Sequence, residues 1–290
     1  MGMLDSKTIL ITGGSVGIGF EVAKKCVSEG ASVIIAARNK ENLERSIEEL
    51  KKITDADHHF YRVDVSQFKE VQEFAKWCSE KIPEINGLVN CAGIYGPIGK
   101  IYQVDMKKFA EAIQINLLGT VYMCNVFSPL IKSTSQKKIV NFSGGGAATP
   151  FANYSAYSTS KIAIVRLTEN LSIELFDEGF DVNCVAPGFV ITRLHQQTIE
   201  AGPELATKNF YDSTKKQMDS GGVPAEKAVN LTAFLLSSES DGITGKFISA
   251  PWDPWQDTCF QSRLRQDKDF ATLRRIDEKT FLKKSRSNEL

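Results

Sequence analysis

The segment from residue 8 to residue 30 joins a short apolar run to a helical pattern through a glycine-rich turn. The run Thr8–Ile11 is rich in β-branched side chains, as buried strands are. The turn TGGSVGIG spans residues 12–19, and a helical apolar pattern then continues to Gly30. Glycines let backbone N–H groups come close to a pyrophosphate, and the positive end of a helix dipole favours it. The order predicts a dinucleotide-binding unit, although a turn without a ligand has the same pattern.

Strand-like and helical segments alternate along the whole chain. Strands are expected to start near residues 8, 32, 60, 87, 138, 181 and 246. This alternation predicts an α/β fold, a Rossmann-type doubly wound parallel sheet of about seven strands. The chain has 290 residues and is 42% hydrophobic, which suits a single domain with a large core. We expect that domain over residues 1–255, followed by a charged C-terminal extension over residues 256–290.

The second expected strand ends in Ala37-Arg38-Asn39. In dinucleotide-binding folds an acidic residue at this place binds the ribose 2′-hydroxyl, whereas an arginine accommodates a 2′-phosphate. The guanidinium of Arg38 therefore favours NADP as the cofactor. NAD stays open, because a single arginine is also an ordinary surface residue.

Tyr157 and Lys161 stand four residues apart, which places them on one face of a helix. An ammonium beside a phenol stabilises the phenolate and lowers the pKa of the phenol from its ordinary ~10. Such a phenol is a usable general acid or base for a carbonyl or hydroxyl oxygen. Taken alone, the pair also fits a solvated helix face.

Four blocks of the chain resemble the short-chain dehydrogenase/reductase family, between about Lys7 and about Pro251. The resemblance implies an NAD(P)-dependent oxidoreductase that acts on a small carbonyl or secondary alcohol and assembles as a homodimer or homotetramer. The matching blocks are Thr12-Gly13-x-x-x-Gly17-x-Gly19, Asn90-Cys91-Ala92-Gly93, Tyr157-x-x-x-Lys161 and Pro187-Gly188-x-x-x-Thr192.

The same resemblance implies roles for single residues. Asp64 would meet the adenine ring, Asn90 would shape the sheet edge, and Thr192 would hold the nicotinamide carboxamide. Asn116 would bend a helix and hold a water that leads to Lys161, or serve as a helix-interior amide with a backbone partner. The catalytic residues would be Asn116, Ser143, Tyr157 and Lys161. The cofactor would contact Gly13, Ser15, Gly17, Ile18, Gly19, Arg38, Asp64, Val65, Asn90, Ala92, Gly93, Tyr157, Lys161, Pro187, Gly188, Val190 and Thr192.

Ser143 departs from the family's pattern. The family usually has a serine just past the fifth strand, where it polarises the substrate oxygen. Ser143 lies one residue further from Tyr157 than is usual, and strict spacing puts Gly144 in the serine's place. We expect the glycines at 144–146 to form a bulge that keeps Ser143 facing Tyr157. The alternative is a displaced serine and an altered site.

Two regions near the C-terminus are irregular. Residues 193–222 are polar and predict a lid over the substrate, with a surface excursion as the alternative. The tail after residue 255 carries interleaved charges of both signs, which fits a solvated helical extension or an arm on a neighbouring subunit or over the site. The segment with Trp252 and Trp255 suits a substrate pocket or a subunit interface. Candidate substrate contacts in the lid are Arg193, His195, Phe210 and Tyr211.

Composition excludes several classes of function. The formal net charge is zero, so no attraction to nucleic acid or to an anionic membrane is expected. No apolar run approaches the roughly 18 residues of a membrane span, and no signal-peptide pattern opens the chain. Six scattered cysteines without a C-x-x-C pair indicate reduced thiols in a cytoplasmic protein. The three histidines have no metal-ligand spacing, and His58-His59 predicts a polar turn.

Two other functions fit the same fold. One is a non-enzymatic dinucleotide-binding regulator. The irregular serine region and the long tail favour it. The other is a sugar epimerase or dehydratase, although little chain remains after the seventh strand for the larger substrate domain of such enzymes. The substrate itself is not readable from the residues.

Overall fold

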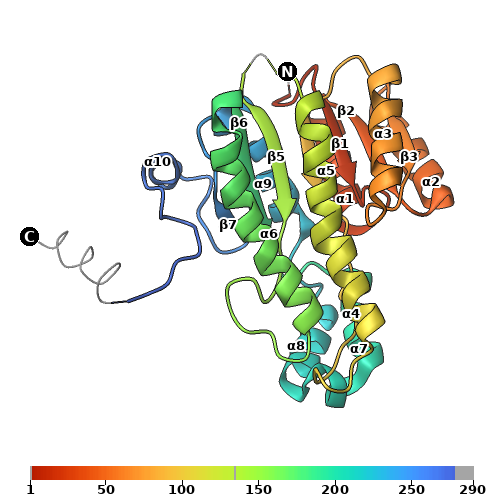
Figure 1. Cartoon of the computed structure of the whole chain (residues 1–290), viewed down its shortest axis with the longest axis vertical. Helices are drawn as coiled ribbons and strands as arrows, with labels where there is room; N and C mark the ends of the chain where they lie inside the picture. Colours follow the sequence, from red (N-terminus) through yellow and green to blue (C-terminus); the bar gives the residue numbers. More distant parts are fainter. Residues whose placement is uncertain (1, 134, 278–290) are drawn as a thin grey trace, which may run out of the picture.

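The computed structural model describes residues 2–133 and 135–277, and its sheet has seven parallel strands. Figure 1 shows this sheet between layers of helices. The order of the strands is β3-β2-β1-β4-β5-β6-β7. Every strand starts within one residue of its expected position, so the predicted doubly wound α/β fold is confirmed. The strands are β1 (Thr8–Thr12), β2 (Ser32–Ala37), β3 (His59–Arg62), β4 (Gly87–Asn90), β5 (Lys137–Phe142), β6 (Phe180–Ala186) and β7 (Phe247–Ser249).

Helices cover both faces of the sheet, because its central strands are buried on both sides. Val22 of α1 and Leu235 of α9 belong to the apolar cluster on one face, and Phe74 of α3 contacts Phe127 of α5 on the other. The first face carries α1 (Gly17–Ser28), α2 (Lys40–Lys51) and α9 (Ala225–Leu236); the second carries α3 (Phe68–Lys81), α5 (Gly119–Phe127) and α6 (Ser155–Glu174).

The strand order reverses between β1 and β4, which are neighbours in the sheet. The chain leaves β1 toward one edge and leaves β4 toward the other, so the connections diverge at the carboxyl ends of these strands. Ligands of open α/β sheets bind in the crevice that this divergence creates. The fold thus brings the glycine-rich turn after β1 and the segment after β4 to one place.

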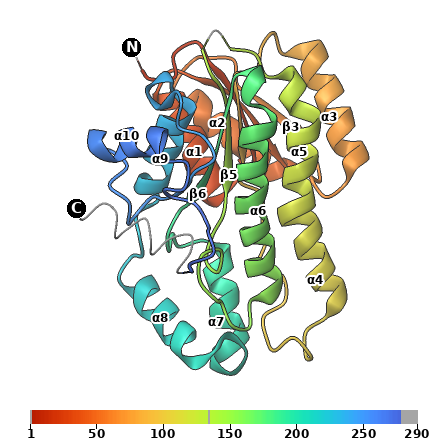
Figure 2. The same ribbon diagram turned by 60° about the vertical axis from the view of Figure 1, so that its left-hand side comes forward.

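The irregular region at 193–222 forms α7 (Arg193–Ala206) and α8 (Lys208–Asp219). Both lie beyond the carboxyl ends of the strands, close to the ends of α4 (Met106–Ile113) and α6 (Figure 2). Helix α7 is kinked at Gly202, whose φ is 77°, with Pro203 next to it. The Nδ2 of Asn153 donates to the Leu205 carbonyl at 2.8 Å and fixes this excursion to the loop before α6.

The tail packs on its own chain as far as it is described. After α10 (Thr258–Gln266) it runs along β7, where Phe247 N donates to Ala271 O at 2.8 Å. Arg274 then pairs with Glu169 of α6. The expected solvated helical extension holds for α10, which is mostly exposed, but not for residues 267–277, which are not helical and cover the open edge of the sheet. Residues 278–290 lie outside the described residues.

Two smaller expectations are also corrected. His58 is buried and its Nδ1 accepts from Val33 N at 3.4 Å, so it is part of the core and not of a polar turn. Trp255 is buried against Phe234, with a ring distance of 5.7 Å, whereas Trp252 is 81% exposed. In residues 2–133 and 135–277, no helix combines the length and the apolar character needed to cross a membrane.

Candidate active site

The glycine-rich turn after β1 forms one wall of a cavity of about 800 Å³. Gly13 and Gly17 have φ values of 68° and 58°, a backbone region that favours glycine. A Cβ on Gly13 would come within 2.9 Å of the Cα of Ala92, and one on Gly19 would overlap the carbonyl oxygen of Gly13. Side chains are therefore excluded here, and the first turn of α1 borders the cavity through its backbone.

A cation and a carboxylate, Arg38 and Asp64, also line the cavity. Arg38 follows β2 and Asp64 follows β3, and the guanidinium NH1 of Arg38 lies 3.9 Å from Asp64 Oδ2. The Oδ1 of Asp64 also accepts hydrogen bonds from Ser66 N at 3.0 Å and Ser66 Oγ at 2.7 Å. Both side chains line the cavity together with Asn39 and Asn42.

Most of the residues expected to contact a cofactor line this cavity. Asn90 does not: it is buried, and its Nδ2 donates to Asn141 Oδ1 at 2.9 Å, which links β4 to β5. Gly188 and Val190 are also outside the lining; Gly188 packs against Pro251 and Val190 is buried. The lining includes Gly13, Ser15, Gly17, Ile18, Gly19, Arg38, Asp64, Val65, Ala92, Gly93 and Thr192, but not Asn90, Tyr157, Lys161, Pro187, Gly188 or Val190.

Part of the cavity wall was missed by the sequence analysis. Lys108 and Glu111 of α4, together with Gln197 of α7, line the same space. Arg193, expected only as a substrate contact, lines it as well. These residues belong to no motif, and only the packing of α4 and α7 around the crevice brings them there.

Asn116 lies in a π-helical turn, Gln114–Leu118, that joins α4 to α5. Its Oδ1 accepts from Ile94 N at 2.8 Å, and its Nδ2 donates to Ile94 O and Ser160 Oγ, both at 2.9 Å. The side chain is thus a helix-interior amide with backbone partners. A Cβ on Gly93 would lie 3.2 Å from Asn116 Oδ1 and 3.4 Å from Lys161 Nζ, so all three residues meet at one point.

Tyr157 and Lys161 occupy successive turns of α6 and are 7% and 4% exposed. The Nζ of Lys161 donates to Phe142 O at 2.9 Å and lies 5.6 Å from the centre of the Tyr157 ring. Burial raises the pKa of the Tyr157 phenol and lowers that of the Lys161 ammonium. The expected lowering of the phenol's pKa is therefore not found in this structure, because desolvation of the phenolate dominates.

Ser143 does not face Tyr157. Its Oγ donates to the backbone oxygen of Lys161 at 3.1 Å, and its N donates to Val185 O at 2.9 Å. The pairing of β5 with β6 thus continues through Ser143, and no bulge absorbs the extra residue. Gly144 instead faces the phenol, since a Cβ there would overlap the Tyr157 hydroxyl oxygen. The prediction of a bulge is therefore wrong. The structure agrees with the alternative, in which Ser143 is displaced from the site.

Aromatic rings enclose Tyr157. Tyr95 meets it edge-on at 4.8 Å, and Tyr154 lies 5.2 Å from Tyr95. Phe210 of α8 contacts Tyr154 at 5.3 Å, and the Tyr154 hydroxyl shares a hydrogen bond of 2.9 Å with Thr198 Oγ1 of α7. Helices α7 and α8 therefore pack directly over the ring cluster that contains the tyrosine.

His195 belongs to the same enclosure. Its ring lies 3.9 Å from the Phe189 ring and 6.1 Å from the Tyr95 ring, and its Nδ1 accepts from Thr192 N at 3.4 Å. Burial lowers the pKa of His195 to about 4 from its ordinary 6.5. The imidazole is accordingly neutral near pH 7 and caps the start of α7.

This shift predicts a loss of stability in acid. Below pH 6.5 the unfolded chain binds a proton at His195 that the folded chain takes up only near pH 4, so stability falls as pH falls between these values. Between pH 7.5 and pH 4.5, the titration of His195 is expected to lower the free energy of unfolding by about 2 kcal/mol. Urea unfolding of the wild type and of His195→Gln at both pH values measures it: the variant is expected to lose about 2 kcal/mol less. Equal losses in both proteins would contradict the assignment.

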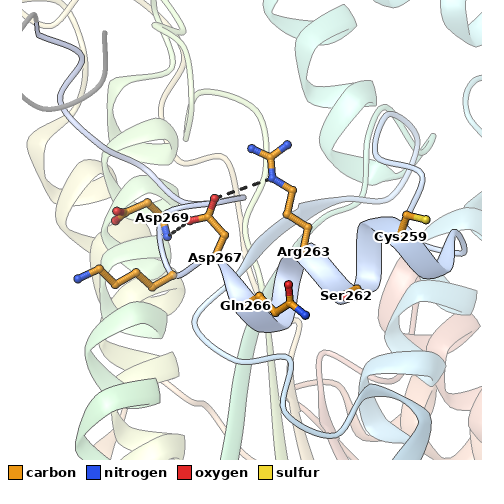
Figure 3. A pocket seen from close by; sticks show the side chains of 7 residues that line it. Cys259, Ser262, Arg263, Gln266, Asp267 and Asp269 are labelled. Carbon is orange, nitrogen blue, oxygen red and sulfur yellow. Dashed lines mark hydrogen bonds and ion pairs between the residues drawn. The ribbon is translucent and has the colours of Figure 1, made fainter. Parts of the chain in front are cut away.

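A second depression, of about 690 Å³, lies on the outer side of α10 (Figure 3). The Nε of Arg263 lies 3.8 Å from Asp267 Oδ2, and its guanidinium stacks 3.9 Å from the centre of the Phe270 ring. Most residues that line the depression are exposed, and the guanidinium of Arg263 already has partners. The depression shares no lining residue with the cavity beside the glycine-rich turn, and we assign no function to it.

Comparisons with known proteins agree with this architecture. The short chain dehydrogenase family model matches residues 7–202. Dehydrogenase/reductase SDR family member 4 of Caenorhabditis elegans is 30% identical over 84% of this chain and 93% of its own length. The 7alpha-hydroxysteroid dehydrogenase of Escherichia coli (strain K12) is 26% identical over 85% of this chain and 93% of its own.

A solved structure is similar as well. A putative short chain dehydrogenase from Shigella flexneri, in complex with NADP, superposes with a TM-score of 0.73 at 25% identity and covers 86% of this chain and 98% of its own. Nothing in these comparisons supports the non-enzymatic alternative. The family model matches well over half of the residues, across the glycine-rich turn and the Tyr157–Lys161 pair. The chain therefore belongs to the short-chain dehydrogenase family of oxidoreductases.

Proposed function

We propose that this protein is an NADP(H)-dependent oxidoreductase that interconverts a carbonyl compound and a secondary alcohol. One observation carries the proposal: Tyr157 and Lys161 are buried on successive turns of α6, and Lys161 Nζ approaches Gly93 in the wall of the cavity. The similarity to a hydroxysteroid dehydrogenase and to an NADP-bound neighbour supports the same chemistry.

The residues present fit a dinucleotide. The turn at Gly13 and Gly19 has no room for side chains, and it joins the N-terminus of α1, where backbone N–H groups favour a pyrophosphate. We place the 2′-phosphate beside Arg38, adenine near Asp64 and the nicotinamide carboxamide at Thr192. When bound, the nicotinamide supplies or accepts the hydride.

The chain's own residues handle the proton. In the reducing direction the Tyr157 hydroxyl donates its proton to the carbonyl oxygen, and the charge of Lys161 stabilises the phenolate that remains. Asn116 holds the segment at Ile94 next to Lys161, which keeps the ammonium in place. The Tyr157 phenol is protonated near pH 7, and burial raises its pKa further, so it is present in the form that can donate a proton. In the oxidising direction the same residue, as phenolate, would accept the proton.

The direct test is turnover with a panel of small ketones, diketones and cyclic alcohols, followed through the absorbance of NADPH. We expect reduction of at least one carbonyl class, faster with NADPH than with NADH. Tight NADPH binding without any turnover across the panel would support the non-enzymatic regulator instead.

Cofactor preference is predicted to depend on Arg38. Replacing Arg38 by alanine removes a charged partner of the 2′-phosphate, so the dissociation constant of NADPH is expected to rise about 10–100-fold while that of NADH changes little. Fluorescence titration measures both constants. Arg62→Ala is the matched control, because Arg62 is exposed, pairs with Glu70 at 3.8 Å and does not line the cavity. Equal effects on NADPH and NADH would contradict the role of Arg38.

We also propose, from the family alone, a cytoplasmic homodimer or homotetramer. Sedimentation equilibrium of the purified chain measures the number of subunits. A monomer at micromolar concentration would contradict this part of the proposal.

A further inference from the structure

Three consecutive backbone amides lie without partners beside the tyrosine. Ser143 N donates to Val185 O, and Ala147 N donates to Gly144 O at 3.3 Å. Between them, the N–H groups of Gly144, Gly145 and Gly146 have no acceptor among residues 2–133 and 135–277. Gly144 and Gly146 are half-buried and Gly145 is exposed, so these three amides are free to bond water or a ligand.

The turn geometry explains how these donors are kept available. The bond from Ala147 N to Gly144 O closes a four-residue turn, and Gly146 has a φ of 83° at its third position. A positive φ there is what a type II turn requires. In such a turn the two inner residues, here Gly145 and Gly146, donate no hydrogen bond to the turn itself, and the first residue, Gly144, contributes only its carbonyl oxygen, so all three amides stay open to a ligand.

Gly144 also lies against the Tyr157 hydroxyl, the group that donates the proton in the proposed reaction. A Cβ at this position would overlap the Tyr157 hydroxyl oxygen and come within 3.0 Å of the ring carbon Cζ. The backbone of Gly144 is therefore in direct reach of the phenol, and its amide and that of Gly145 adjoin the same Cα. Glycine permits this approach because it has no side chain.

The usual donor is turned away. The hydroxyl of Ser143 is committed to the backbone oxygen of Lys161 and is 2% exposed. Thr149 is exposed in the loop that follows the turn. A carbonyl oxygen that gains negative charge during hydride transfer needs a donor besides the phenol, and preorganised backbone amides serve this purpose well.

We propose that the backbone N–H groups of Gly144 and Gly145 hold the substrate oxygen beside Tyr157, in the place of the serine hydroxyl. This inference rests on the proposed function, since it concerns the same carbonyl oxygen. According to this proposal, the hydroxyl of Ser143 is not needed for the reaction. The substrate oxygen is polarised by main-chain N–H groups, which a pattern of side chains in the sequence does not reveal.

Variants at 143 and 145 test the proposal by steady-state kinetics on the carbonyl that the panel identifies. Ser143→Ala is expected to keep kcat within about threefold, because its hydroxyl does not reach the substrate. Gly145→Pro removes one amide donor at a turn position that favours proline, and kcat is expected to fall about 100-fold. Gly145→Ala is the matched control: it keeps the amide, and its Cβ would make only an ordinary contact of 3.6 Å with Phe151.

The outcomes separate this inference from the proposed function. Suppose that Tyr157→Phe loses turnover and that kcat of Ser143→Ala falls about 100-fold or more. This result would contradict the role of the backbone amides and would leave the proposed function standing. Equal kcat values for Gly145→Pro and Gly145→Ala would also contradict the role of the backbone amides. Full turnover by Tyr157→Phe would overturn the proposed function itself. Melting temperatures confirm that each variant is folded.

A second readout does not depend on turnover. In protein labelled with ¹⁵N-glycine and ¹³C′-serine, Gly144 gives the Ser–Gly signal that Ser143→Ala removes, and Gly145 gives the glycine signal missing from Gly145→Ala. With NADP present, addition of trifluoroethanol as an alcohol probe is expected to move the amide protons of Gly144 and Gly145 downfield. Shifts at Gly93 with unchanged signals at both turn glycines would overturn the proposal.

Discussion

Replacing Tyr157 by phenylalanine is expected to lower kcat by about 10²–10⁴-fold, the range that a positioned general acid contributes. The hydroxyl is the proton donor in the proposed reaction, whereas the ring carries the packing. Phenylalanine keeps the edge-on contact with Tyr95 at 4.8 Å, so the fold is expected to be unchanged. Stopped-flow kinetics under single-turnover conditions separate loss of the chemical step from slow product release.

The matched control is Tyr154→Phe, three residues earlier in the chain. Tyr154 is in the same ring cluster, but its hydroxyl is bonded to Thr198 at 2.9 Å and points to α7. Its loss is expected to change kcat only a few-fold, and both variants should bind NADPH as the wild type does. Normal turnover by Tyr157→Phe, or equal losses in the two variants, would rule out Tyr157 as the acid.

Replacing Lys138 by methionine is expected to lower the free energy of unfolding by about 3–5 kcal/mol. Lys138 is the second residue of β5 and is 1% exposed, and its Nζ lies 2.7 Å from both Asp181 Oδ2 and Asp241 Oδ1. Asp181 is buried at the start of β6 and also accepts from Gly242 N at 3.1 Å. Without the ammonium, a buried carboxylate loses its counter-charge at the amino ends of the strands, far from the cavity.

The comparison with an exposed pair makes this test specific. Lys208 and Asp212 are 2.6 Å apart on α8, with side chains 77% and 55% exposed. Lys208→Met is expected to cost no more than about 1 kcal/mol, as exposed pairs usually do. Urea unfolding at pH 7 measures both variants. A cost below 1 kcal/mol for Lys138→Met would show that water reaches Asp181 when the lysine is removed.

The fold was predictable because its signals are local. Strands of a parallel sheet covered on both faces are continuous apolar runs, such as Thr8–Thr12 and Ser32–Ala37, and a glycine-rich turn follows the first of these two. The starts of all seven strands could be placed for this reason. The tail could not, because Arg274 finds Glu169 across more than a hundred residues of chain, and no local pattern encodes that pair.

The site was predictable only in part. The glycines around Gly13 and the ends of β2 and β3 line the cavity, since the crevice position follows from the topology. Asn90 and Ser143 have the right residue types, but each side chain is bonded away from the site, to Asn141 and to the Lys161 backbone. A shift of one residue along an extended chain turns a side chain to the other face, and spacing to a distant tyrosine does not resolve such a shift.

The sequence by itself determined the order of strands and helices, the glycine cradle and the tyrosine–lysine pair, because these depend on periodicity and on backbone freedom. The tertiary structure decided that Gly144 faces the phenol while Ser143 turns away, and that burial raises the pKa of Tyr157. Both outcomes arise from surroundings contributed by β6, α7 and the segment around Tyr95. The direction of the Ser143 side chain and the desolvation of Tyr157 depend on residues from several separate parts of the chain. No single segment of the sequence therefore determines them.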